Sequence, residues 1–428
     1  MLSLKKIIPL FLPLIIAFYY IYPQALGIRG SSFVLLSGVI GLALYIYHGF
    51  PFKEIINLFA GLGIMYFWAY TCGWMNGVGD PYTFGYVKTQ IAYIFSSYLV
   101  IFLIFRFHKS PTYNTMLLYI AAVIFLQAII TFIMNRNEAV MDFLGALQMQ
   151  ELYTEEIMEE GASQRLMGYG ISFFGAGAVS GVGLVTLSYL LMRMKLDNKS
   201  FIALVVMYVF TFYIGLFMAR TTVVGLGMGL MLIAVLFLWD RRSVKSQAKT
   251  FVIASGFLMV GGYIFAMFYF PHFSDWAFEL FRNFVDTGTL NTHSSAGLEQ
   301  MFLLPEDLHT WVWGKGQMVF WGSDVGYSRM LFWVGLPGTI IFYGYQLYII
   351  KLSLTKDWGV NMFGLTILIY TLALNIKGWI DLTQILYLIF FYFLFYKYYV
   401  YYPQSYAKAR ENLLVQRRRS KINRAKNK

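Results

Sequence analysis

The sequence predicts an all-α, polytopic membrane protein, in which about twelve transmembrane helices form a single integral domain over residues 1–428. Hydrophobic residues make up 59% of the chain and charged residues only 13%, about half the charged share of a soluble domain. So few charges cannot cover a soluble globule of this size, which excludes a cytosolic enzyme and a disordered chain. A single cysteine, Cys72, excludes an internal disulfide.

Twelve apolar runs carry this prediction. A helix needs about 20 apolar residues to cross a hydrocarbon core of about 30 Å. The runs cover residues 7–22, 33–47, 55–75, 87–105, 112–134, 169–192, 201–218, 223–239, 251–270, 330–350, 359–376 and 382–396.

The basic residues predict the orientation. If the spans alternate from a cytoplasmic N-terminus, 24 of the 33 lysines and arginines fall inside, whereas 16 of the 21 acidic residues fall outside. Both termini are therefore expected in the cytoplasm. The basic tail, 403–428, is expected to lie against anionic headgroups, and a role in nucleic-acid binding is disfavoured because such tails commonly fix topology.

Two long outer loops follow from this topology, at 135–168 and 271–329. The first is acidic, and its pattern predicts a helix over 138–160. The second opens with an amphipathic segment, with Trp276 and Phe284 on one face and Glu279 and Arg282 on the other. Such a helix either lies flat on the outer leaflet or caps the bundle.

Small residues recur inside two spans, as Gly177-x-x-x-Gly181 and Gly225-x-x-x-Gly229. This spacing is typical of helices that approach each other closely, so packing explains it best.

Charged groups are nearly absent from the predicted spans, with only Lys88 at an outer boundary. Ion-coupled transporters usually keep ionisable groups near the middle of the membrane, so the transporter that twelve spans would suggest is disfavoured. No phosphate-binding loop, catalytic triad motif or metal-ligand spacing occurs, so neither a cofactor nor a metal is expected. Any functional site should lie at the outer face.

Outer cations are the first candidates for that site. Arg220 lies in a very short turn between two spans, where an arginine facing lipid would cost several kcal/mol. Arg165 ends the first long loop, Lys88 begins the fourth span, and Arg282 lies on the amphipathic segment. Guanidinium groups match phosphate oxygens, so converging arginines would suit a lipid-linked diphosphate. For Lys88 and Arg282, snorkelling toward headgroups is an equal alternative.

The second long loop ends in a glycine-rich stretch that leads directly into a span. It places Lys315, Asp324, Tyr327 and Arg329 near the mouth of that span, where an acid, a phenol and two cations could bind a sugar and move a proton. Three histidines also fall in this loop, His272, His293 and His309, and each alone is more often structural than catalytic.

The order of these motifs resembles the Wzy-type oligosaccharide repeat-unit polymerases, relatives of the O-antigen ligases. The shared pattern is R-x-x-G at 165–168, an Arg-Thr turn at 220–221, and a large outer loop. That loop closes with G-x-G at 314–316 and S-D-x-G-Y at 323–327, before a span with G-x-x-G at 335–338. The motifs cover about the second half of the chain.

The resemblance implies a metal-independent membrane glycosyltransferase, similar to the C-type enzymes, at the outer face of a bacterial plasma membrane. Such an enzyme transfers a growing chain from undecaprenyl diphosphate to another lipid-linked repeat unit. Arg165 and Arg220 would bind the diphosphate, with Lys88, Arg282, Lys315, Tyr327, Arg329 and His293 as further substrate-binding candidates. Asp324 would act as base, and His293 or His309 could substitute for it.

Further expected partners are membrane lipids, with a chain-length regulator and a flippase as candidates. Three alternative functions stay open: a ligase that transfers polymer to another acceptor, an exporter of lipid-linked oligosaccharide, and a non-enzymatic scaffold of an envelope complex.

Overall fold

The computed structural model describes residues 4–27, 29–108, 110–148, 165–171, 173–269, 271–288 and 297–401, and within these residues every regular element is helical. Each of the twelve apolar runs forms a helix. These helices are α1 (Leu4–Ile21), α2 (Arg29–Tyr47), α3 (Lys53–Met75), α4 (Pro81–Phe107), α5 (Tyr113–Met134), α8 (Phe173–Arg193), α9 (Asn198–Met218), α10 (Thr222–Trp239), α11 (Lys245–Tyr269), α17 (Gly326–Leu352), α18 (Trp358–Leu374) and α19 (Thr383–Phe395).

Shorter helices connect them. They are η1 (Pro23–Leu26), α6 (Glu138–Leu147), α12 (Pro271–Ala277), α13 (Glu279–Thr287), α15 (Leu298–Met301), α16 (Leu308–Trp313) and the π-helical turn η3 (Tyr396–Tyr401). Among the described residues, eight helices are long and apolar enough to cross a membrane: α2, α3, α4, α5, α8, α9, α10 and α17. The chain therefore has the make-up of a multi-pass membrane protein, and the count of twelve spans stays a prediction.

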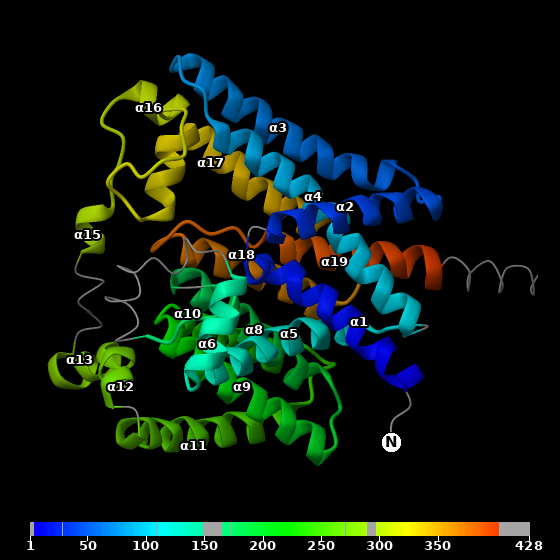
Figure 1. Cartoon of the computed structure of the whole chain (residues 1–428), viewed down its shortest axis with the longest axis vertical. Helices are drawn as coiled ribbons and strands as arrows, with labels where there is room; N and C mark the ends of the chain where they lie inside the picture. Colours follow the sequence, from blue (N-terminus) through cyan, green and yellow to red (C-terminus); the bar gives the residue numbers. More distant parts are fainter. Residues whose placement is uncertain are drawn as a thin grey trace, which may run out of the picture.

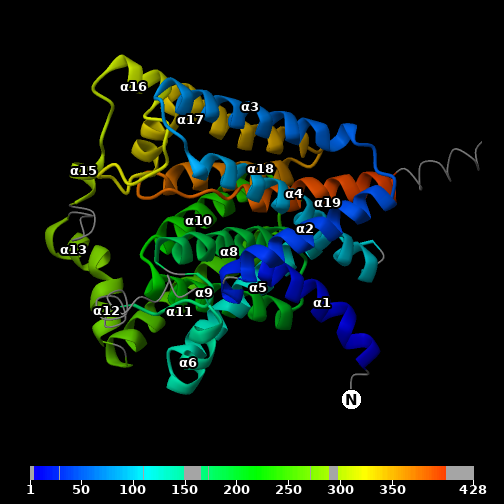
Figure 2. The same cartoon turned by 45° about the horizontal axis from the view of Figure 1, so that its top comes forward.

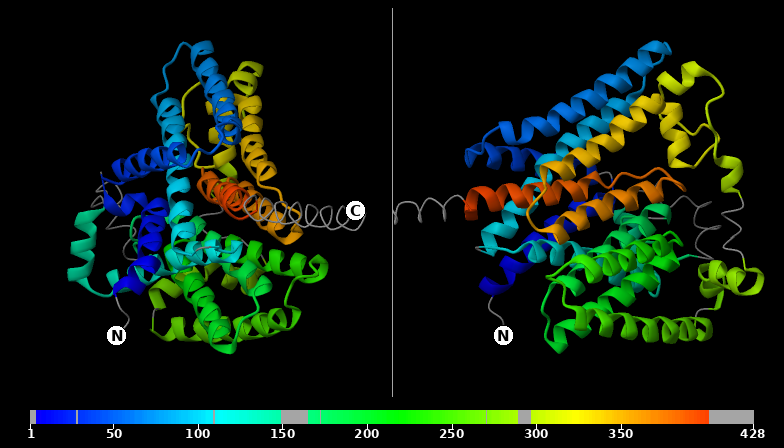
Figure 3. Two further views of the ribbon diagram at one scale, coloured as in Figure 1. Left: turned by 90° about the vertical axis from the view of Figure 1, so that its right-hand side faces the viewer. Right: turned by 180° about the vertical axis from the view of Figure 1, so that it is seen from behind.

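The two ends of the bundle differ (Figure 1). Helices α12, α13, α15 and α16 gather at one end, which we call the loop end, whereas α1 begins and α19 finishes at the opposite end. Two further orientations show the same separation (Figures 2 and 3). The loop end is the end that the charge pattern predicts to face outward.

Helix α8 is enclosed by other helices of the bundle. Its residues 176–192 are all buried, and it packs against α5, α9, α10 and α18. At its crossing with α10, a Cβ on Gly225 would collide with the Cα of Gly181. The packing interpretation of the two small-residue patterns is therefore confirmed.

The glycine-rich motif has a structural explanation in a kink of α17. Gly335 has φ 66°, and Pro337 has no N–H to offer the carbonyl of Trp333. That carbonyl instead accepts from the Gly316 N–H at 3.1 Å, and the Phe332 carbonyl accepts from the Lys315 N–H at 2.5 Å. Gly316 itself has φ 73°, a conformation that favours glycine. The G-x-G segment therefore closes the break in the helix.

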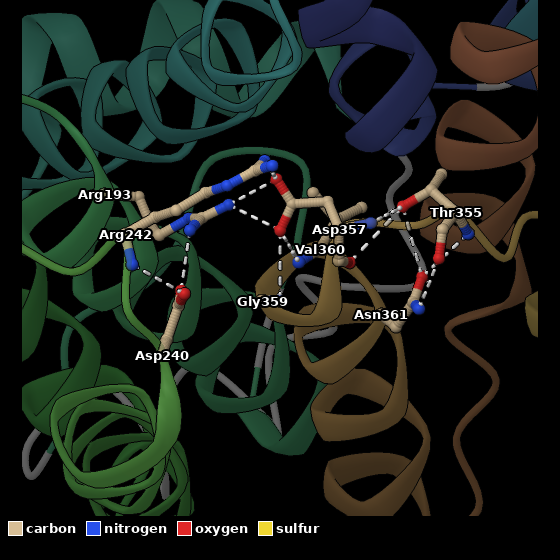
Figure 4. A network of polar contacts seen from close by, with 8 residues as sticks. All are labelled: Arg193, Asp240, Arg242, Thr355, Asp357, Gly359, Val360 and Asn361. Carbon is tan, nitrogen blue, oxygen red and sulfur yellow. Dashed lines mark hydrogen bonds and ion pairs between the residues drawn. The ribbon is translucent and has the colours of Figure 1, made fainter.

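A charged network joins three helices at the end opposite the loops (Figure 4). Arg193 of α8 donates to Asp240 at 2.7 Å and to Asp357 at 2.5 Å, and both Arg193 and Asp240 are buried. Asp357 also accepts from the Gly359 N–H at 3.1 Å, which caps the first turn of α18. One carboxylate thus fixes both the start of a helix and its attachment to α8.

Both predicted loop helices differ in length from the sequence prediction. In the first loop, α6 ends at Leu147 rather than near 160, and residues 149–164 lie outside the described residues. In the second, the amphipathic segment divides into α12 and α13 at Phe278. The Phe278 ring is buried and meets the Tyr263 ring of α11 at 4.7 Å, so the segment caps the bundle here. Phe284 and Val285, farther along α13, remain exposed.

Candidate functional site

Arg165 and Arg220 meet at the loop end on one indole ring. The guanidinium carbons lie 4.9 Å and 4.5 Å, respectively, from the centre of the Trp276 ring, a contact typical of cation–π interactions. The backbone explains the pairing, because the Leu166 N–H donates to the Phe217 carbonyl at 3.0 Å. This bond ties the segment after Arg165 to the last turn of α9, three residues before Arg220.

The α9–α10 turn holds Arg220 in a buried position. Its side chain is 9% exposed, and one terminal nitrogen lies 2.5 Å from a Glu279 oxygen at the start of α13. Its Nε is buried and has no hydrogen-bond partner among the described residues. In a buried guanidinium, each N–H group usually has a hydrogen-bond acceptor. The Nε–H of Arg220 can therefore still donate to a further acceptor.

Lys377 is a third cation near this pair, and the sequence analysis did not single it out. It lies in the short turn between α18 and α19. Its pKa is lowered, mainly by burial and further by the charges of Arg220 and Arg165. The sequence did hold one clue to Lys377. It is one of the nine lysines and arginines predicted to lie outside, and it falls in one of the shortest outer connections.

The electrostatics of this cation cluster, Arg165, Arg220 and Lys377, favour an anion. Burial lowers the pKa of Arg165, and it also lowers the pKa of Arg220, where repulsion by Arg165 adds to the effect and Glu279 opposes it. Glu279 pairs with Arg220, and the positive charge of the cluster is partly desolvated. A ligand with two or more negative charges would relieve this repulsion, which suits a diphosphate.

Asp324 and Tyr327 adjoin the turn that carries Lys377. The Tyr327 N–H donates to the Asn375 carbonyl at 3.1 Å, and its hydroxyl donates to the Leu372 carbonyl at 2.7 Å. The start of α17 is therefore packed on the end of α18. Asp324, two residues before α17, is exposed, and no contact between it and the cluster occurs in the described parts of the chain.

The other predicted cations lie elsewhere. Lys88 lines a separate cavity of about 480 Å³ beside η1 and α2. Arg282 pairs with Asp275 on the neighbouring short helix, and its part in substrate binding stays a prediction. Lys315 lies over the rings of Trp321 and Phe332, at 4.6 Å and 4.9 Å from their centres. Arg329 is half-buried, with an Nε that has no partner within the described ranges.

Two predicted histidines complete the candidates. His309 is exposed on α16, where its Nε2 lies 3.3 Å from the Asn76 side-chain oxygen. His293 lies outside the described residues.

A second polar centre at this end surrounds Asp381, which the sequence analysis also passed over. Asp381 accepts hydrogen bonds from Tyr86 at 2.7 Å and Gln90 at 2.8 Å on α4, and from the Thr383 N–H at 2.8 Å. It lies in the connection before α19, and burial raises its pKa. Its carboxylate therefore joins α4 to α19, with its oxygens already occupied.

Among the described residues, no group of three or more histidine, cysteine or acidic side chains is placed to hold a metal ion. Comparison with protein-family models, with curated proteins and with solved structures finds no match to this chain.

Proposed function

We propose that this protein is a membrane glycosyltransferase that polymerises lipid-linked oligosaccharide repeat units at the outer face of a bacterial plasma membrane. The observation that carries the proposal is the convergence of Arg165, Arg220 and Lys377 from three segments far apart in the sequence. A half-buried, net-positive cluster at the loop end fits the diphosphate of an isoprenoid carrier lipid.

The reaction forms one bond and breaks one. The acceptor sugar's hydroxyl oxygen attacks the anomeric carbon of the donor chain, the bond from that carbon to the diphosphate oxygen breaks, and the carrier diphosphate leaves with the bonding electrons. The cation cluster binds this diphosphate and stabilises the negative charge that develops on it. Loss of one such stabilising group typically costs about 100- to 1000-fold in rate.

Asp324 is the candidate base that takes the acceptor hydroxyl proton. Its exposure leaves it open to an incoming sugar, and it lies three residues before Tyr327, whose N–H donates to the Asn375 carbonyl at the end of α18. The oxygens of Asp381, in contrast, are occupied by side chains of the bundle.

A ligase that transfers polymer to another acceptor would use the same cations, so a product assay separates the two. An exporter is less favoured, because Arg220 lies in the α9–α10 turn and pairs with the start of α13, a helix of the loop end, rather than along a path through the bundle. The decisive test is a deletion strain. Single repeat units left on the carrier lipid indicate a polymerase, whereas full-length polymer left on the carrier indicates a ligase.

A point variant tests the site itself. Arg220→Ala should abolish polymer while single units still reach the surface, and Arg282→Ala should retain polymer because Arg282 pairs with Asp275 instead. A normal polymer ladder from Arg220→Ala, with the protein present in the membrane at wild-type level, would contradict the proposal.

A further inference from the structure

Helix α10 carries an unpacked stripe that begins at Val224, in its first turn. Successive exposed residues on it recur every three or four positions, which places them on one face of the helix. The stripe consists of Val224, Gly227, Met231, Ala234 and Leu238. Arg220 lies in the turn just before α10, so the stripe starts at the end of the helix that is nearest this cation.

A cavity of about 510 Å³ lies along this stripe, between α10 and α11. Its lining is almost entirely apolar, and Lys249 is the one charged residue on it. The lining residues are Leu230, Ile233, Ala234, Phe237, Leu238, Ala248, Lys249, Val252 and Ile253. The small side chain of Ala234 leaves the groove open at its centre.

The groove exists because α11 packs on α9 rather than on α10. The Phe251 ring meets the Tyr208 ring of α9 at 4.9 Å, and Gly262 of α11 lies against the Tyr213 side chain. The flank of α11 beside α10 is left exposed, with Ile253 at 62% and Val252 at 49%. The exposed faces of both helices are therefore continuous with lipid.

We propose that this α10–α11 groove binds the polyisoprenyl tail of the carrier lipid whose diphosphate the cation cluster holds. The inference rests on the proposed function for its headgroup end. The occupant follows from this arrangement, since a lipid whose headgroup is held at the turn before α10 would extend along the stripe that starts at the same end of the helix. A tail held against α10 fixes the headgroup in one orientation for transfer.

The length of the stripe fits a long isoprenoid. At 1.5 Å per residue, positions 222 and 238 of α10 are about 24 Å apart along the helix axis. This distance approaches the hydrocarbon thickness of about 30 Å. A short isoprenyl chain would reach only the upper residues of the stripe, whereas a longer one would reach the cavity at Ala234. Affinity should therefore increase with chain length.

Binding measurements on the full chain in lipid nanodiscs test this inference. The probes are inorganic pyrophosphate and a series of isoprenyl diphosphates of increasing length. Ala234→Trp fills the groove and should weaken binding of the longest probe about tenfold, with pyrophosphate binding unchanged. Ala60→Trp, at an exposed alanine of α3, is the matched control and should bind every probe as the wild type does.

A photoreactive group at the far end of the longest isoprenyl diphosphate gives a second measurement, which needs no variant. It should label peptides that contain residues 230–238 or 248–253. Labelling elsewhere, or unchanged binding of the long probe by Ala234→Trp, would overturn the groove and leave the headgroup site standing. A wild-type protein that binds no pyrophosphate would instead overturn the proposed function.

Discussion

Arg220 and Glu279 form an ion pair across the loop end, with 2.5 Å between a guanidinium nitrogen and a carboxylate oxygen. Arg220 comes from the α9–α10 turn and Glu279 from the first residue of α13, so the pair attaches the second long loop to the bundle. The carboxylate is the one anion paired with the cation cluster in the described parts of the chain. It therefore occupies a place that a diphosphate oxygen would need.

Replacement of this internal anion should strengthen ligand binding. We expect Glu279→Gln to bind pyrophosphate about three- to tenfold more tightly, because the ligand no longer competes with a carboxylate that is one-quarter exposed. Titration calorimetry on the purified protein measures the change. Asp275→Asn removes the neighbouring carboxylate, which pairs with Arg282, and should leave the affinity unchanged. Weaker binding by Glu279→Gln would show that Glu279 positions the cluster instead.

Lys377 predicts a pH dependence of that binding. Its pKa is lowered below the ordinary value of 10.5, and only the protonated amine attracts an anion. Affinity for pyrophosphate should therefore fall as pH rises through this lowered pKa, before a normal lysine would lose its proton. Lys377→Arg should move the loss to higher pH, and Lys377→Met should weaken binding at neutral pH. Identical profiles for wild type and Lys377→Arg would remove Lys377 from the site.

Asp381 predicts the pH dependence of stability. Burial raises its pKa above the ordinary value of 3.8, so the folded protein holds this proton more tightly than the unfolded chain. The carboxyl therefore contributes less to stability as pH rises through the interval between these two values. As pH rises over the same interval, the melting temperature of Asp381→Asn should increase relative to that of the wild type. A difference that stays constant with pH would contradict this account.

Hydropathy was sufficient to predict the helices, but not the partners of the charged residues. Each apolar run became a helix because a membrane-length apolar segment has one stable backbone conformation, and this is a local property. From the sequence, we could predict that Arg165 and Arg220 lie at the same end of the bundle, but not how they meet. The ring that joins them, Trp276, belongs to a loop whose path no local pattern specifies.

The glycine motifs show the limit of motif reasoning more clearly. Gly316 and Gly335 belong to motifs on which the family resemblance rests, whereas in the structure they close the kink of α17. Lys377 and Asp381 were missed for the opposite reason, since single charged residues in a short turn form no pattern. Their surroundings come from α4, α9 and α17, which are distant in sequence.

The last prediction concerns the charged network at the opposite end. Arg193→Ala would leave Asp240 and Asp357 near one another without the buried guanidinium that neutralises both, which should cost about 3–5 kcal/mol of stability. Arg242→Ala is the matched control, because Arg242 also pairs with Asp357 but its side chain is 70% exposed, and it should cost under about 1 kcal/mol. Thermal unfolding in detergent micelles compares the two. Equal losses of stability would mean that burial does not govern this network. We expect the larger loss for Arg193→Ala because water can replace Arg242 beside Asp357 but cannot reach the place of Arg193.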